Sequence, residues 1–139
     1  MKYLVLFLLV MFSCNINADV TLFDYYLTLS EQQKQTLVNY CKLENFPENT
    51  SFDTKGDVCY YASFYINELM SKEEKTRYLL SQESIRYMNK ACYYYKVSNS
   101  KINRINMCKE TYKLFYENFM CHTSTSVECN LLKDYYLYY

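Results

Sequence analysis

Three cysteines and the only histidine of the chain lie close together toward its C-terminus. Cys108, Cys121, His122 and Cys129 have the residue types that hold zinc in proteins. However, twelve residues separate the first two cysteines and seven separate the last two, whereas zinc sites are built from close pairs such as CxxC. Adjacent Cys121 and His122 would also have difficulty reaching one ion. We therefore expect no metal site and no cofactor.

A second interpretation is nucleophilic catalysis, in which His122 would activate the thiol of Cys121. This chemistry needs a free thiol, so the cellular compartment decides whether it is available. A positive residue, Lys2, precedes the unbroken apolar run Tyr3–Phe12, and small and polar residues follow up to Ala18. That is the layout of a secretory signal peptide, and the run is too short for a membrane span, which needs roughly 20 apolar residues.

The mature protein is therefore expected to be secreted. We predict that residues 1–18 are the signal peptide and that residues 19–139 form a single domain, which is long enough to bury a core. Removal of the signal takes Cys14 away and leaves six cysteines in an oxidising compartment. An even number of cysteines in such a chain predicts three disulfides. Of the possible pairings we favour those between successive helices: Cys41–Cys59, Cys92–Cys108 and Cys121–Cys129.

Glycine and proline are almost absent, which favours an all-α fold. The chain has one glycine, Gly56, and one proline, Pro47, whereas a β-rich domain needs many tight turns built from these residues. A single glycine also argues against a phosphate-binding loop, and with the cysteines paired we expect that the protein is not an enzyme. We predict a compact bundle of about five to six short helices braced by three disulfides.

Caps and apolar periodicity indicate where the first helices begin and end. One helix is expected over Thr21–Leu27, and a second begins after the capping box of Ser30 and Gln33 and carries Cys41. The segment Asn45–Gly56 contains both the proline and the glycine, so it should be the longest loop of the chain.

The later helices follow the same signals. Asp57 is expected to cap the next helix, Ser71 and Glu74 resemble a capping box that restarts it, and Ser81 is expected to mark a further break or kink. Polar joints at Ser98–Ser100 and before the last helix separate the remaining elements. The apolar stripes are Cys59, Ala62, Ile66 and Leu69; Ile85, Met88, Cys92 and Tyr95; Ile105, Cys108, Tyr112, Phe115 and Phe119; and Cys129, Leu132 and Tyr136.

The charges of the chain do not indicate a nucleic-acid partner or an anionic membrane surface. There are 15 basic and 15 acidic residues, so the protein has no strong electrostatic field of either sign. Lys101, Arg104, Lys109 and Lys113 are near one another in sequence, but their angles around a helix scatter. We expect these four side chains to be solvated.

Tyrosine is the unusual feature of the composition, with 18 residues and no tryptophan. Several tyrosines are consecutive, and consecutive residues of a helix point in different directions, so some rings should lie outside the core. Exposed tyrosine suits protein interfaces because its ring is large, rigid and able to hydrogen-bond, although an AT-rich coding sequence would also enrich it. We predict Tyr94, Tyr116 and Tyr138 as interface residues.

Two functions therefore stay open. The first is a secreted effector or ligand that binds an extracellular protein partner or receptor through a tyrosine-rich helical surface. The second is a carrier that holds a small apolar ligand among side chains such as Met88. The tail Cys108-x12-Cys121-x7-Cys129 resembles the end of the six-cysteine pattern of insect odorant-binding proteins, which implies such a carrier. The CxxxC pair of that family is absent from this chain.

One loop also carries an acceptor for an N-linked glycan. Asn49-Thr50-Ser51 is an Asn-x-Ser sequon beside Pro47, and we expect a glycan there if the host cell is eukaryotic. Such a glycan would solubilise that side of the protein and keep partners away from it. Asn106-Met107-Cys108 is a rarer form of acceptor, which we expect to be empty because Cys108 should be buried in a disulfide.

Overall fold

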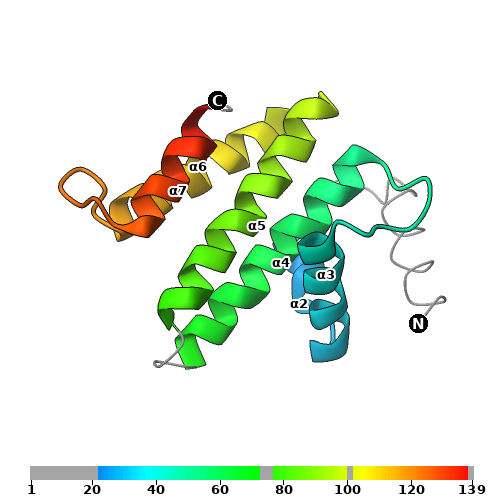
Figure 1. The fold of residues 1–139 in the computed structure, drawn as a ribbon. Helices are drawn as coiled ribbons and strands as arrows, with labels where there is room; N and C mark the ends of the chain where they lie inside the picture. The colour runs from blue at the N-terminus through cyan, green and yellow to red at the C-terminus, as the bar shows by residue number, and fades with distance from the viewer. Residues whose placement is uncertain (1–21, 73–76, 100–101, 138–139) are drawn as a thin grey trace.

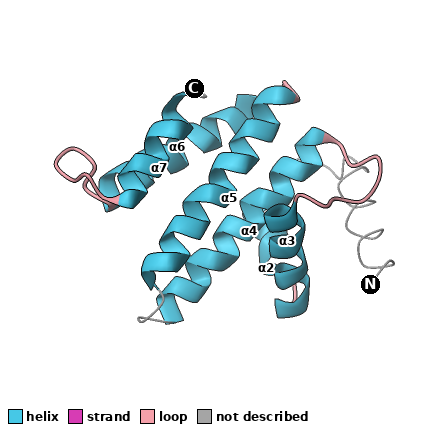
Figure 2. Ribbon diagram, in the orientation of Figure 1, coloured by secondary structure: helices cyan, strands magenta, loops and turns pink. Residues whose placement is uncertain are grey.

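The protein is a bundle of helices in the computed structural model, which describes residues 22–72, 77–99 and 102–137. The expected signal peptide, Thr21 and Tyr138 lie outside these residues. Within them no strand is present, so the predicted all-α bundle is confirmed (Figure 2). The helices are α2 (Leu22–Leu27), α3 (Glu31–Leu43), α4 (Phe52–Lys72), α5 (Arg77–Val97), α6 (Ile102–Asn118) and α7 (Val127–Leu137).

Two long antiparallel helices, α4 and α5, form the centre of the bundle (Figure 1). Helix α3 packs against α4, whereas α6 and α7 pack against α5 and against each other. The short α2 is held on α4 by Tyr26, whose ring centroid lies 6.1 Å from that of Tyr61 and 5.5 Å from that of Phe64. None of the helices in this described part of the chain is long and apolar enough to cross a membrane.

Each disulfide links successive segments of the chain, and the predicted pairing is confirmed. Cys41–Cys59 joins α3 to α4, Cys92–Cys108 joins α5 to α6, and Cys121–Cys129 joins the loop before α7 to α7 itself. The first two bridges are buried in the core, with their cysteines at most 1% exposed. Apolar periodicity placed these cysteines correctly on the inner faces of their helices.

One cap was predicted correctly and one was not. Ser30 and Gln33 form the expected capping box at the start of α3, with reciprocal side-chain to backbone hydrogen bonds of 3.2 and 2.7 Å. Helix α4 begins at Phe52, earlier than predicted, because the hydroxyl of Ser51 accepts a hydrogen bond from the backbone amide of Thr54 at 3.2 Å. Asp57 is therefore inside α4 and does not cap it.

One predicted interruption lies near its expected place and one is absent. Helix α4 ends at Lys72 and α5 begins at Arg77, close to the predicted restart at Ser71 and Glu74. The Ser71 hydroxyl donates a hydrogen bond to the carbonyl of Glu68 within α4, and Glu74 lies outside the described residues. Helix α5 runs unbroken through Ser81, whose hydroxyl donates a buried hydrogen bond of 3.0 Å to Glu128 on α7. Serine favours helix ends through local hydrogen bonds, and here Ser81 makes a tertiary one.

Candidate interaction sites

Most of the tyrosines whose side chains the structure describes are buried or partly buried. The predicted exposure of Tyr94 is wrong, because this residue is 8% exposed. Its ring packs against Phe46 and Phe52, and its hydroxyl donates a hydrogen bond of 3.4 Å to Glu44. Burial, together with the negative charge of Glu44, raises the pKa of Tyr94 to about 12. The other buried tyrosines are Tyr26, Tyr60, Tyr61, Tyr65, Tyr87 and Tyr95.

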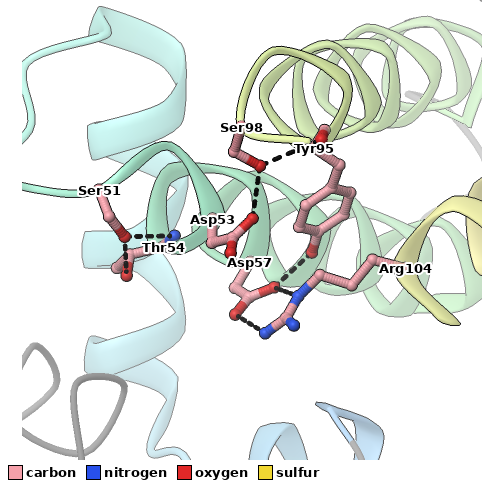
Figure 3. A network of polar contacts seen from close by, with 7 residues as sticks. All are labelled: Ser51, Asp53, Thr54, Asp57, Tyr95, Ser98 and Arg104. Carbon is pink, nitrogen blue, oxygen red and sulfur yellow. Dashed lines mark hydrogen bonds and ion pairs between the residues drawn. The ribbon is translucent and has the colours of Figure 1, made fainter. Parts of the chain in front are cut away.

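A buried polar cluster joins α4, α5 and α6 (Figure 3). Asp57 lies at its centre with a side chain that is 3% exposed. Its two carboxylate oxygens accept hydrogen bonds from Arg104 at 3.0 and 2.9 Å, and one of them also accepts a hydrogen bond from the Tyr95 hydroxyl at 2.5 Å. The prediction that Arg104 is solvated is wrong, because a carboxylate this deeply buried needs a paired cation.

The only glycine of the chain makes room for this cluster. Gly56 was expected in a loop because glycine is a poor helix former, but it lies in the first turns of α4. A Cβ atom at Gly56 would lie only 2.5 Å from Cε1 of Tyr95, which is much closer than van der Waals contact. The need for the Tyr95 ring to approach the α4 backbone explains why glycine occupies this position.

The contacts of this cluster indicate a structural role. Burial raises the pKa of Asp57 above its ordinary value, while the hydrogen bonds and charge of Arg104 and the hydroxyl of Tyr95 oppose that shift. The hydrogen bond to Asp57 in turn raises the pKa of Arg104. One turn earlier on α4, Asp53 accepts a hydrogen bond of 2.5 Å from Ser98, which follows α5. Together these bonds fasten the beginning of α4 to the end of α5 and the beginning of α6.

Aromatic rings gather beside the loop between α3 and α4. The ring of Tyr94 stacks against Phe52 at a centroid distance of 6.1 Å and meets Phe46 in a T-shaped contact at 5.8 Å. The ammonium nitrogen of Lys55 lies 5.1–5.9 Å from the centroids of all three rings. Phe52 is 44% exposed and Tyr93, which adjoins Tyr94, is 46% exposed. We call Phe46, Phe52, Tyr93 and Tyr94 the loop-side aromatic patch.

The connection between α6 and α7 is a second exposed site, which we call the disulfide-closed loop (residues 119–126). It projects from the edge of the bundle in Figure 1, and Cys121–Cys129 closes it. Met120 has a φ of 50° and is 68% exposed. Its carbonyl accepts hydrogen bonds from the amides of Thr123 and Ser124 at 3.1 and 3.0 Å. These bonds and the disulfide give the loop a defined shape.

Tyr116 and His122 form the aromatic part of this second site. The ring of Tyr116 is partly buried and meets the His122 ring in a T-shaped contact at a centroid distance of 4.6 Å. His122 is exposed. Because the sulfur of Cys121 is bonded to Cys129, it is not a thiolate that His122 could activate. Of the two predicted interface tyrosines that the structure describes, Tyr94 is buried and Tyr116 is partly exposed beside this loop.

Similarity to other proteins adds nothing to this geometry. No known family model matches the chain, and no curated protein and no solved structure shows significant similarity to it. The likeness of the last three cysteines to the odorant-binding pattern therefore has no further support. Among the described residues, the loop-side aromatic patch and the disulfide-closed loop each combine exposed apolar side chains with defined local contacts.

Proposed function

We propose that this protein is a secreted, non-enzymatic interaction protein that binds an extracellular protein partner through the disulfide-closed loop. The observation that carries the proposal is the exposure of Met120, at 68%, on a loop whose shape is held by Cys121–Cys129. A preformed apolar loop loses little conformational entropy when it binds, so more of its contact energy is left for affinity. Tyr116 and His122 extend the same surface with ring edges that are suited to an interface.

Secretion is supported by two independent features. The beginning of the chain has the charge and apolar pattern of a signal peptide, and the six remaining cysteines form three disulfides in the folded chain. Disulfides persist in oxidising compartments and are rare in the cytosol. Asn49 is exposed on a loop, in agreement with its proposed role as a glycan acceptor.

The tyrosine-rich surface expected from the sequence becomes smaller in this proposal. Tyr94 belongs to the core, whereas Tyr116 remains near solvent at the end of α6, with its ring 5.8 Å from that of Tyr112. The proposed binding surface is therefore a loop with adjoining tyrosines, and not a face of a helix covered with them.

The proposal can be tested by placing a photo-crosslinking amino acid at His122 in the secreted, oxidised protein. A matched probe at Leu43, which is 70% exposed at the end of α3, serves as the control. We expect the His122 probe to give one dominant extracellular protein adduct and the Leu43 probe to give none. Equal labelling from both positions would contradict the proposal.

Variants of the loop then measure its contribution to binding of the captured partner. Met120→Asn removes the apolar side chain and keeps a residue that tolerates positive φ. We expect it and Tyr116→Ser to weaken binding by about tenfold or more, as hot-spot residues do. Leu43→Ser should have no effect, and the melting temperature of Met120→Asn should match that of the natural protein. Unchanged binding by both Met120→Asn and Tyr116→Ser would refute this function.

The carrier alternative has a distinct outcome. Met88 and Phe115, two of the side chains that a carrier would place around its ligand, are buried in the main core cluster. If the protein is a carrier, native mass spectrometry should show an apolar ligand that is lost on organic extraction. Such a ligand, found together with full binding by Met120→Asn, would favour the carrier over the interaction protein.

A further inference from the structure

Asn49 is held in a tight turn between α3 and α4. The amide of Thr50 donates a hydrogen bond to the carbonyl of Pro47 at 3.2 Å, and the Thr50 hydroxyl donates to the same oxygen at 2.5 Å. Asn49 has a φ of 63°, a left-handed conformation that asparagine adopts more readily than most residues. It is also exposed. The glycan acceptor is therefore presented from an ordered turn.

The loop-side aromatic patch flanks this acceptor on both sides in the sequence. Phe46 lies three residues before Asn49 and Phe52 lies three residues after it. Both rings contact Tyr94, which joins them into one surface next to the turn. Phe52 nevertheless remains 44% exposed, and neighbouring Tyr93 remains 46% exposed. The Lys55 ammonium lies near the rings of Phe46, Phe52 and Tyr94 but leaves Phe52 partly open to solvent, so a further group can cover this surface.

We propose that an N-linked glycan on Asn49 covers the loop-side aromatic patch, with the C–H face of its first sugars lying on Phe46 and Phe52. The inference rests on the proposed secretion, because the glycan is added in the export pathway. The donor is a lipid-pyrophosphate-linked oligosaccharide. The side-chain Nδ2 of Asn49 forms a bond to C1 of the first sugar, the bond from C1 to the pyrophosphate oxygen breaks, and Nδ2 loses one proton as the lipid pyrophosphate leaves.

A glycan fits this surface better than a protein partner does. The C–H faces of pyranose rings are apolar and gain dispersion contacts on aromatic rings, while the sugar hydroxyls stay in water. A branched sugar chain anchored three residues from each phenylalanine would also obstruct a protein that approached the patch. The same modification therefore supplies a cover for the rings and leaves the disulfide-closed loop for the partner.

The hydroxyl of the sequon has a second role, which determines how the proposal is tested. In the folded protein Ser51 accepts a hydrogen bond from the amide of Thr54 and donates one of 2.9 Å to the Thr54 hydroxyl. Replacing Ser51 would remove the glycan and the cap of α4 together. Asn49→Asp is the better variant, because aspartate also tolerates positive φ and is the residue that enzymatic release of the glycan leaves behind.

The first experiment is mass spectrometry of the full chain secreted from eukaryotic cells. We expect a glycan at Asn49 and none at Asn106, whose sequon ends at the disulfide-bonded Cys108. A chain that is secreted without a glycan at Asn49 would overturn this inference and leave the proposed function intact. A chain that is not secreted at all would instead overturn the proposed function.

The second experiment is hydroxyl-radical footprinting of the glycosylated protein, the enzymatically deglycosylated protein and Asn49→Asp. We expect oxidation of Phe52 and Tyr93 to rise severalfold when the glycan is absent, while oxidation of Met120 stays the same. Equal oxidation of Phe52 in all three samples would show that the glycan does not cover the patch. Protection that persists without the glycan and increases with protein concentration would assign the patch to a second copy of the chain, and would also overturn the inference.

Discussion

Replacing the only glycine tests whether the contact between Tyr95 and α4 is as close as the structure indicates. In Gly56→Ala the new methyl group would lie 2.5 Å from Cε1 and 2.6 Å from Cδ1 of Tyr95. The ring is fully buried and its hydroxyl is bonded to Asp57, so it has little freedom to move away. Helix propensity alone favours alanine over glycine by about 1 kcal/mol, so without the ring this substitution would stabilise the protein.

The steric effect should outweigh the gain in helix propensity. Overpacking a core typically costs about 1–3 kcal/mol. Displacing Tyr95 would also weaken its hydrogen bond to Asp57, and hydrogen bonds to charged groups contribute about 1.5–3 kcal/mol. After the alanine gain is subtracted, we expect Gly56→Ala to lower the free energy of unfolding by about 2 kcal/mol, which corresponds to a fall in melting temperature on the order of 8 °C for a domain of this size.

Thermal and denaturant unfolding of the oxidised protein measure this change, and a double-mutant cycle supplies the control. In a Tyr95→Leu background the ring is absent, so Gly56→Ala should become neutral or stabilising by up to about 1 kcal/mol. A change of sign between the two backgrounds would establish the contact. If Gly56→Ala stabilises the natural protein, or has the same effect in both backgrounds, the argument from close approach is wrong.

Two other expectations concern the buried polar cluster and the tyrosine core. Arg104→Met should lower the free energy of unfolding by about 3 kcal/mol in denaturant titrations, because it leaves the carboxylate of Asp57 buried without a cation. The double variant Asp57→Leu/Arg104→Met should recover most of that loss. An Arg104→Met variant as stable as the natural protein would contradict the ion pair. Burial raises the pKa of Tyr60 to about 12 from 10.0, so the folded protein holds this proton more tightly than the unfolded chain does. The contribution of this pKa shift to the free energy of unfolding is complete below pH 10 and is lost as the pH rises toward 12. The free energy of unfolding, measured as a function of pH, should therefore begin to decline near pH 10. Tyrosinate absorbance that titrates fully at pH 10 in the folded protein would contradict this assignment.

Local signals in the sequence were enough to predict the helical class and the disulfides. The scarcity of glycine and proline excluded a fold rich in tight turns. The capping box of Ser30 and Gln33 depends on residues three positions apart, so it can be recognised without knowledge of the fold. Cysteines on the inner faces of successive helices could pair with near neighbours, and the loops that separate them are short.

Three of the errors share a different cause, because each concerned a residue that has a contact distant in sequence. Asp57 has the residue type of a helix cap, but Arg104, 47 positions later, neutralises it inside the bundle. Gly56 has the residue type of a loop, and the ring of Tyr95 gives it a place within α4. Ser81 has the residue type of a break and instead bonds to Glu128 on α7. Intrinsic preference is a weak prior that tertiary contacts override.

The exposure of each tyrosine likewise depended on the tertiary structure. Consecutive tyrosines on a helix do point in different directions, and Tyr93 is exposed while Tyr94 and Tyr95 are buried. Helical periodicity alone predicts that one of these three tyrosines faces solvent, but it does not predict which one. In the structure Tyr94 is buried because Phe46 of the α3–α4 loop and Phe52 of α4 cover it. The sequence by itself therefore indicated that the chain is helical, favoured one of the possible disulfide pairings and determined where a glycan can be attached. Which aromatic and charged side chains are buried was decided only when α3, α4, α5 and α6 came together, because burial depends on what a neighbouring segment covers and not on the residue alone.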